Sequence, residues 1–393
     1  MERLAGVYDF SVHSPLSAHR FLLRASLAAA NVFAWILLFD AFVSSSQSLV
    51  GALGVTAIVY AGAALSTLLL TPIAGTMMRN GIKRTMTIAI VSYVLALDIL
   101  AAVFLTQGSW DYIFVSLVAF AFCMGAYRAF YFVPYSLAAE EEPHPSWFSL
   151  EMLLALVPAG AGLILVSSTQ GYLVLFAMAG ILALFSLLPI SSIPDIYERY
   201  AWQYSVPFRA LVSRQHRKLF TACVCDGIHG AGLLFVWPIT ALLLLSWSYF
   251  LLGVVLSVTF IAAICLREAL QHLHARHPRS LALISVSSWV VRFSAFSPVT
   301  IALADVMYYS SAPKDAHGID MIAGEHPTDG GLYIDEMTAL KEMALALGRI
   351  TLAIIVIVCA TFATLDIALM LSLALAALAA IVSHYAPRSE RVI

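Results

Sequence analysis

Residues 49–84 read LVGALGVTAIVYAGAALSTLLLTPIAGTMMRNGIKR. The part from Leu49 to Ala74 carries no charged residue, and three basic residues, Arg79, Lys83 and Arg84, follow it closely. About 20 apolar residues are enough for an α-helix to cross the hydrocarbon core of a bilayer. Short loops rich in Lys and Arg stay on the cytoplasmic side. This stretch therefore predicts a transmembrane helix that ends at the cytoplasm.

The rest of the chain has the same character. Of its 393 residues, 61% are hydrophobic and 11% are charged, whereas an average soluble domain is about 45–50% apolar and about 25% charged. No soluble fold of this size could hide so much apolar surface. The net charge of −2 provides no basic field for nucleic acid. Composition therefore excludes a soluble enzyme, a disordered chain and a nucleic-acid-binding protein, and it predicts an all-α, multi-pass membrane protein surrounded by lipid.

Apolar runs of sufficient length predict about twelve transmembrane helices. Ten runs are continuous: 21–43, 49–74, 85–105, 112–138, 147–167, 172–190, 219–245, 249–266, 344–364 and 367–384. Residues 278–313 are long enough for two shorter spans, broken near Pro298. Because α-helices must satisfy their own backbone hydrogen bonds in lipid, the expected fold is a helical bundle.

Basic residues occupy alternate loops. Lys and Arg precede the first span, follow the second, sixth, eighth and tenth spans, and lie in the tail, while loops 44–48, 107–111, 168–171 and 246–248 contain none. Residues 140–142 are acidic and break the pattern, although acidic residues weigh little in orientation. The expected location is the cell (inner) membrane, with both termini in the cytoplasm.

The spans divide into two six-helix halves, residues 1–190 and 219–393, joined by a cytoplasmic linker at 191–218. Aromatic and charged residues alternate in the linker, which predicts a helix lying on the inner membrane surface. Residues 314–336 carry six acidic residues and are expected to form a mobile cytoplasmic loop within the second half. This division depends on hydropathy and loop charge alone.

Twelve spans, both ends inside and a central linker resemble the major facilitator superfamily over the whole chain. The loop after the second span also resembles that family's signature, which contains a glycine, an Asp–Arg pair, a second glycine and basic residues. Arg79, Gly81, Lys83 and Arg84 match it, whereas Met78 stands where the aspartate is expected. The resemblance implies a transporter whose first, fourth, seventh and tenth helices line a central cavity.

A further local resemblance lies in the fifth span. Pro158, Gly160 and Gly162 are similar to a Gly/Pro segment of the family's antiporters, where such residues bend a helix and allow close packing. Pro and Gly are common in membrane helices generally, so antiport remains one alternative. The subfamily stays open.

Candidate solute-binding residues lie on the first, fourth and tenth spans. Tyr127, Tyr131 and Tyr135 recur every four residues and so share one helix face, beside Arg128. Aromatic rings and a guanidinium suit an anionic or aromatic solute, although helix packing and snorkelling are the structural alternative. The further candidates are Asn31 in the first span and Tyr308 in the tenth.

Three titratable groups are candidates for proton coupling. Asp226 and His229 are three residues apart on the seventh span, and Asp305 lies at mid-depth in the tenth. Ionisable groups inside a membrane are expensive, about 2.5–3.5 kcal/mol on insertion scales, and are commonly functional. A structural hydrogen bond is the alternative for Asp226. The sequence leaves Arg128 and Arg292 as equal candidates for the partner of Asp305.

Charged residues near the cytoplasmic side are candidates for a gate. Arg79, Lys83 and Arg84 belong to the signature loop, and Glu151 and Arg349 lie near the inner ends of the fifth and eleventh spans with opposite charge. These residues predict a charged inner gate between the halves.

No cofactor or metal is expected. Two groups of soft ligands lack the spacing of a closed metal site; they are Cys223, Cys225 and His229, and His272, His274 and His277. The chain has no phosphate-binding glycine loop and no nucleophile–base arrangement, so an enzyme is not expected.

The sequence predicts a secondary active transporter that moves a small solute by alternating access, with proton coupling. The class of solute is not determined, and a monomer is compatible with the sequence. Two other classes are the alternatives: a non-transporting scaffold or assembly factor with this fold, and a lipid-modifying membrane enzyme, for which the sequence offers no catalytic cluster at either interface.

Overall fold

The computed structural model describes residues 15–45, 48–105, 110–140, 148–197, 203–214, 217–270, 278–311 and 334–385. Within these ranges the chain forms helices joined by short turns, and no strand occurs there. The cytoplasmic features predicted for residues 1–14, 272–277 and 314–333, including three histidines and most of the acidic loop, lie outside the described residues.

The first half of the chain forms six membrane-length segments. The helices are α1 (Pro15–Ser44), α2 (Leu49–Met77), α3 (Ile82–Leu105), α4 (Trp110–Glu140), α5 (Phe148–Ala155), α6 (Val157–Ser167), α7 (Gly171–Phe185) and α8 (Leu187–Ile190). The fifth segment is divided into α5 and α6 directly before Pro158, which occupies the first turn of α6. Proline is tolerated in a first turn because its missing N–H would have no partner there.

The second half also forms six segments, preceded by the short linker helix α9 (Val206–Val212). Its helices are α10 (Arg217–Ala231), η3 (Gly232–Val236), α11 (Trp237–Leu244), α12 (Tyr249–Ala269), α14 (Pro278–Phe293), α15 (Pro298–Ser310), α17 (Ile334–Phe362) and α18 (Leu365–Tyr385). The seventh segment is continuous through η3, a π-helical turn that lies directly before Trp237 and Pro238. Proline has no N–H to donate within a helix, and helices often kink at a proline or at a π-helical turn.

The prediction of about twelve transmembrane helices is confirmed. Ten helical segments in the described ranges are long and apolar enough to cross a membrane, and they coincide with the ten continuous apolar runs. The other two are α14 and α15, which divide residues 278–313 as expected. Ser297 and Thr300 form a reciprocal capping box that begins α15 at Pro298, and this box satisfies backbone donors at the start of the helix.

The predicted start of the eleventh segment was wrong. The eleventh segment begins at Ile334 rather than 344, so the last three residues of the predicted loop 314–336 are helical. Asp335, Glu336, Lys341 and Glu342 depress the hydropathy of this region although the helix continues through it. Within the linker the structure describes one short helix, α9 (Val206–Val212), and residues 198–202 and 215–216 lie outside the described ranges.

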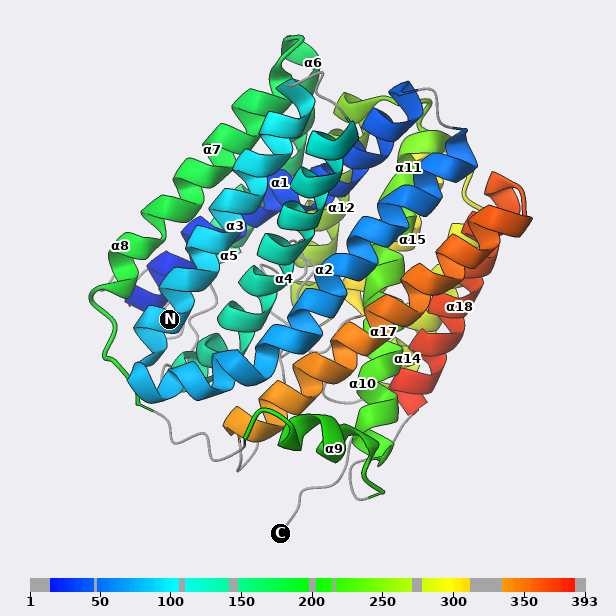
Figure 1. Ribbon diagram of the computed structural model, residues 1–393. Helices are drawn as coiled ribbons and strands as arrows, with labels where there is room; N and C mark the ends of the chain where they lie inside the picture. The colour runs from blue at the N-terminus through cyan, green and yellow to red at the C-terminus, as the bar shows by residue number, and fades with distance from the viewer. Residues whose placement is uncertain are drawn as a thin grey trace, which may run out of the picture.

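In the bundle, α2 and α17 lie side by side at the front of the molecule (Figure 1). Within the first half α3 packs on α4 and α7, and α2 on α4. Within the second half α10 packs on α17 and α18, and α12 and α14 pack on α15. The main contacts between halves join α2 to α17, α6 to α12, and α4 to α17. The domain limits at 190 and 219 stay a prediction.

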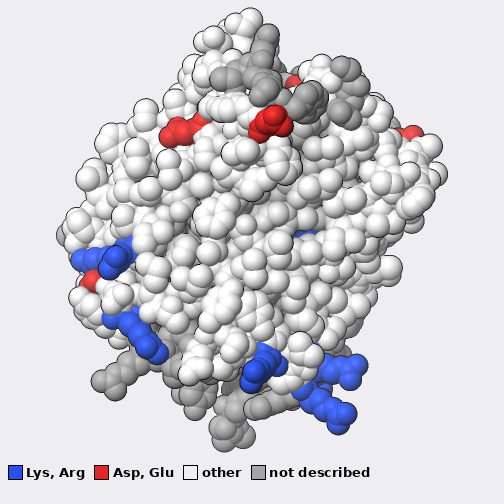
Figure 2. Space-filling model, viewed as in Figure 1, with Lys and Arg blue, Asp and Glu red and all other residues white. Residues whose placement is uncertain are grey.

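Charge and hydrophobicity are distributed along the bundle as a membrane requires. Most Lys and Arg on the face in Figure 2 lie in its lower half, at the end of the bundle where α9 lies in Figure 1. We call this the α9 end, and the end where α1 meets α2 the far end. Between them, large apolar side chains such as Phe114 and Val290 are each 68% exposed. By the positive-inside rule the α9 end is predicted to be cytoplasmic.

Two glycines let α6 and α12 approach each other closely. At the contact of α6 with α12, a Cβ on Gly162 would meet the carbonyl oxygen of Tyr249, and a Cβ on Gly253 would meet that of Pro158. Small residues permit such close backbone approach in membrane helices. These two glycines therefore permit the close contact between α6 and α12.

Candidate functional site

A central cavity lies between the two halves. Its lining residues come from α1, α4, α10, η3 and α17; they are Asn31, Tyr127, Arg128, Phe132, Asp226, Gly230, Leu234, Glu342, Leu345 and Arg349. The cavity volume is about 30 Å³, which accommodates one or two water molecules. A solute larger than water can enter only if the halves move apart.

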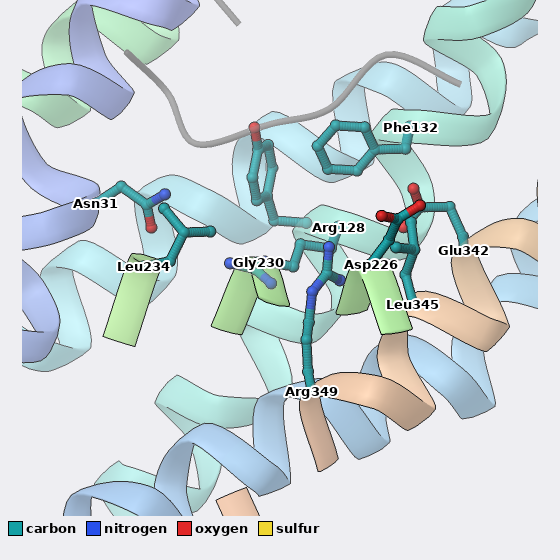
Figure 3. Close-up of a pocket in the computed structure, with 10 residues that line it drawn as sticks. Asn31, Arg128, Phe132, Asp226, Gly230, Leu234, Glu342, Leu345 and Arg349 are labelled. Atoms are coloured by element: carbon teal, nitrogen blue, oxygen red, sulfur yellow. The ribbon is translucent and has the colours of Figure 1, made fainter. Parts of the chain in front are cut away.

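Four charged side chains face this cavity (Figure 3). Arg128 comes from α4 in the first half, and Arg349 from α17 in the second; both guanidinium groups reach into the same space. Glu342 lies on α17 seven residues before Arg349, so the two share a helix face. Arg128 is 8% exposed and Glu342 2%. Burial at this depth means that these charges act on one another with little screening by water.

The cavity charges are incompletely satisfied. In the described part of the chain, Oε2 of Glu342 and Nη1 of Arg349 are buried without a hydrogen-bond partner. Arg349 feels the repulsion of Arg128 and the attraction of Glu342. Buried polar groups normally have partners, so unpartnered groups facing a cavity indicate a site that another molecule completes.

Asp226 joins the cavity to α18. Its carboxylate Oδ1 accepts a hydrogen bond from Oγ of Ser383. His229, although three residues away, packs its ring on Trp289 and Tyr308 at centroid distances of 5.4 and 5.2 Å. The predicted Asp226–His229 pair is therefore divided: Asp226 lines the cavity, and His229 packs against α14 and α15.

A second charged cluster lies inside the second half. Nη2 of Arg292 on α14 is 2.7 Å from Oδ1 of Asp305 on α15, and Nε1 of Trp237 donates to Oδ2 of Asp305 at 3.0 Å. The guanidinium also lies 4.7 Å from the ring centroid of Trp289 and 5.2 Å from that of Tyr308. The structure thus identifies Arg292, rather than Arg128, as the partner of Asp305. Neither Asp305 nor Tyr308 lines the central cavity.

The tyrosines of α4 form one stacked face, as their spacing predicts. Rings of Tyr127 and Tyr131 are 5.6 Å apart, and those of Tyr131 and Tyr135 are 5.1 Å apart. Only Tyr127 lines the cavity. The hydroxyl of Tyr131 is 3.3 Å from Nε2 of His19, and the guanidinium of Arg24 lies over Tyr135. The stripe therefore connects the cavity wall to the beginning of α1.

Aromatic side chains fill the space between the cavity and the far end. Trp35 of α1 contacts Tyr60, Phe120 and Phe235 edge-on, at centroid distances of 4.9, 5.5 and 6.4 Å. Beyond them, the hydroxyl of Tyr249 in the second half donates to Oδ2 of Asp40 in the first, at 2.5 Å. Packing and a hydrogen bond between halves therefore close the far end.

An apolar contact closes the α9 end. Met78, at the position where the family signature has aspartate, is fully buried against Val133 of α4 and Ala339 of α17. Apolar packing of Met78 therefore joins the end of α2 to α4 and α17. Side-chain contacts between described residues therefore join the two halves on both sides of the cavity.

The predicted gate residues lie apart from one another. In the signature loop, Nζ of Lys83 donates to the backbone oxygen of Ser191 at 2.9 Å, and the backbone N–H of Lys83 donates to Oδ1 of Asp195 at 3.3 Å. Gly81 adopts φ 97°, and a Cβ there would meet the Asp195 carboxylate, so glycine is required. Arg79 and Arg84 are exposed at this end.

Glu151 and Arg349, the other predicted gate pair, occupy different places. Glu151 is 7% exposed on α5, which packs on α1 and α12, whereas Arg349 lines the cavity. A role for either in a gate stays a prediction.

Five predicted site residues are brought together at the cavity: Asn31, Tyr127, Arg128, Asp226 and Arg349. Glu342 was missed, because it lies before the apolar run that defined the eleventh span. The seven-residue spacing from Glu342 to Arg349, two helical turns, was the signal in the sequence. In the described residues no group of three or more His, Cys, Asp or Glu side chains could hold a metal ion.

Comparisons with known proteins identify the fold. No family model and no curated protein sequence matches the chain. Solved structures match over almost its whole length. A D-xylose–proton symporter has 12% identity and a TM-score of 0.57, and the match covers 94% of this chain and 95% of that one. The human organic anion transporter MFSD10 (TETRAN) has 12% identity, a TM-score of 0.56 and coverages of 94% and 98%, and a bacterial homologue of the iron transporter ferroportin has 13% identity, a TM-score of 0.59 and coverages of 93% and 98%. The predicted fold is therefore confirmed: the chain has the fold of these transporters.

Proposed function

From the major facilitator fold and the charged cavity between its halves, we propose that the protein is a secondary active transporter that moves a small solute by alternating access. The single observation that carries the proposal is the cavity itself: Arg128 of one half and Arg349 of the other face one enclosed space. A site at the midplane between two rocking halves is how such transporters expose a solute to each side in turn.

The contacts between the halves support movement of this kind. The far end is closed by Trp35 with Phe235 and by Tyr249 with Asp40, and the α9 end by Met78 with Ala339. Each closure joins a residue of the first half to one of the second. If the contacts at one end separated while those at the other end persisted, the cavity would open on one side only, as alternating access requires.

Proton coupling is part of the proposal. Asp226 and Glu342 are the carboxylates at the cavity, and an ionisable group inside a membrane commonly belongs to an ion or proton pathway. Asp305 and His229 lie in the neighbouring cluster of the second half. We assign the Arg292–Asp305 pair to holding α14 and α15 together rather than to coupling.

The D-xylose–proton symporter among the structural neighbours combines solute and proton movement, which is consistent with coupling in this chain. The neighbours differ in what they carry, so they do not determine a solute. The scaffold alternative came from the incomplete signature, which has Met78 in place of the aspartate, and changes in the acidic loop 314–336 would test it. Most of that loop lies outside the described residues, and no observation favours the alternative.

A transport assay that works with an unidentified solute tests the proposal. Purified protein is reconstituted in liposomes loaded with a mixed metabolite extract, and mass spectrometry follows which compounds leave or accumulate when a pH gradient is imposed. We expect a small set of solutes to move with wild type and not with Arg128→Gln. Movement that ignores the pH gradient would make the protein a uniporter. If no compound moves faster than in protein-free liposomes, the transporter proposal is wrong.

A further inference from the structure

The charges of the cavity indicate the class of solute. Arg128 and Arg349 come from opposite halves and repel each other across the space that they share. A guanidinium presents up to five donors in a planar fork, which suits a carboxylate. Nη1 of Arg349 is buried with no hydrogen-bond partner among the described residues. An anion placed between the two guanidinium groups would relieve the repulsion and supply that partner.

The two carboxylates of the cavity are not equivalent. Asp226 accepts the hydroxyl of Ser383 and is thereby directed toward α18. Glu342 is 2% exposed, and its Oε2 accepts no hydrogen bond from any described residue. With both carboxylates ionised, their two negative charges balance the two positive charges of Arg128 and Arg349. When Glu342 is protonated, the cavity carries one net positive charge, which one solute carboxylate neutralises.

The remaining walls of the cavity are apolar or aromatic. Tyr127 and Phe132 lie on the side of α4, and Leu234 and Leu345 on the side of the second half. A body of hydrocarbon or an aromatic ring would contact these side chains once the cavity widens. An inorganic anion would leave that surface unused, so the walls favour an organic solute.

We propose that the solute is a small organic anion whose carboxylate is held between Arg128 and Arg349, and that a proton on Glu342 accompanies it. The proposal rests on the transporter function given above. One proton from the solution on one side binds a carboxylate oxygen of Glu342, and it returns to the solution on the other side when the solute leaves. No bond of the solute changes.

Several charged or titratable groups among the described residues act on Glu342 or line the cavity with it. They are Arg349 on its own helix, Arg128 and Tyr127 from α4, and Asp226 from α10. Tyr60 from α2 acts on Arg349 in turn. The two arginines stabilise ionised Glu342, and an incoming anion weakens that stabilisation. Anion and proton therefore favour each other's binding, a reciprocal coupling.

Ligand binding to the purified full-length protein tests the solute class. A ligand that binds only the folded state raises its unfolding temperature. The probes are benzoate, hexanoate and succinate, with benzamide and hexanamide as neutral isosteres and choline as a cation. We expect the carboxylates alone to stabilise wild type. Arg128→Gln and Arg349→Gln should weaken carboxylate binding about ten- to a hundredfold, the typical loss of a charge-assisted hydrogen bond, and Arg128→Lys should retain part of it.

The proton is tested with Glu342→Gln, which keeps the shape of the side chain and removes its charge. Wild type should bind benzoate more tightly at pH 5.5 than at pH 7.5, whereas Glu342→Gln should bind it equally at both. Arg209→Gln, at an exposed position on α9, and Asp98→Asn, at an exposed position on α3, are the matched controls; both should behave as wild type. Circular dichroism confirms that each variant is folded.

The outcomes separate this inference from the transporter proposal. If the amides stabilise as well as the carboxylates, if no carboxylate stabilises folded wild type, or if both arginine variants keep full affinity, the anion site is overturned. Equal pH dependence in wild type and Glu342→Gln overturns the role of the proton. The liposome assay with a mixed extract decides independently whether the protein transports anything.

Discussion

At the scale of single residues, the structure separates charges that hold the fold from charges that face the cavity. Arg292 and Asp305 are each 3% exposed or less, lie 2.7 Å apart, and are surrounded by Trp237, Trp289 and Tyr308. Both carboxylate oxygens of Asp305 have partners, one in Arg292 and one in Trp237, although Nε of Arg292 has none among the described residues. Glu342 and Arg349 are also buried, and each has an atom without a hydrogen-bond partner in the described part of the chain, but these two residues face the cavity and Arg292 does not line it. Depth in the membrane alone does not distinguish the Arg292–Asp305 pair from the cavity charges, because all of these residues lie on apolar helices.

Breaking the pair in the second half should destabilise the protein. We expect Asp305→Asn or Arg292→Gln to lower the free energy of unfolding by about 3–5 kcal/mol, because each leaves one buried charge without its counter-charge. Thermal unfolding in detergent measures the loss. The double variant Asp305→Leu/Arg292→Met should recover much of it, and Asp98→Asn should change little. An Asp305→Asn protein of normal stability that had lost proton-driven transport would instead place Asp305 in the coupling pathway.

At the scale of helices, glycines decide how closely the halves approach. Gly162 of α6 and Gly253 of α12 face backbone atoms of the opposite helix, whereas a Cβ on Gly160, two residues away, would meet nothing within 4 Å. The sequence grouped Gly160 and Gly162 in one Gly/Pro segment. Only the packing of α6 against α12 distinguishes these two glycines, since Gly162 faces α12 and Gly160 does not.

We therefore expect Gly162→Ala and Gly253→Ala to disturb the contact between halves. Overpacking a close contact typically costs about 1–3 kcal/mol, so the unfolding temperature should fall in both variants. Gly160→Ala is the matched control and should leave it unchanged or slightly raised, because alanine is the better helix former. Equal effects at 160 and 162 would show that helix propensity rather than interhelical distance governs this segment.

At the scale of the whole molecule, the proposed alternating access requires the halves to separate around the cavity of about 30 Å³. If the halves move as rigid bodies, a covalent link between them should stop transport, and a link within one half should not. The structure provides both positions. A Cβ on Gly54 would be 3.3 Å from Cβ of Ala360 across the halves, and a Cβ on Gly62 would be 3.4 Å from Cβ of Ala121 within the first half.

These separations are close to the 3.5–4.5 Å typical of disulfides. In a background without the five native cysteines, oxidised Gly54→Cys/Ala360→Cys should lose most of its transport and regain it on reduction. Oxidised Gly62→Cys/Ala121→Cys should transport normally in the same liposome assay. Normal transport by the first cross-linked protein would show that α2 and α17 stay together at the far end throughout the cycle, which is incompatible with the proposed rocking of halves.

The sequence by itself determined the class of protein, the number of membrane helices and the candidate charges Arg128, Asp226 and Arg349. These follow from hydropathy, helix length and the energetic penalty of charge in lipid, which are local properties of the chain. The sequence could not place the start of α17, because charges on a helix that faces a cavity lower the hydropathy as a loop does. Glu342 was missed for that reason.

Only the tertiary structure decided which charges share a space. It paired Asp305 with Arg292, divided Asp226 from His229, and brought Arg128 of one half opposite Arg349 of the other. Periodicity assigns a residue to a face of its own helix, but the neighbour of that face depends on how twelve helices pack. The chemistry of the cavity arises from that packing, since its charges come from helices far apart in the chain.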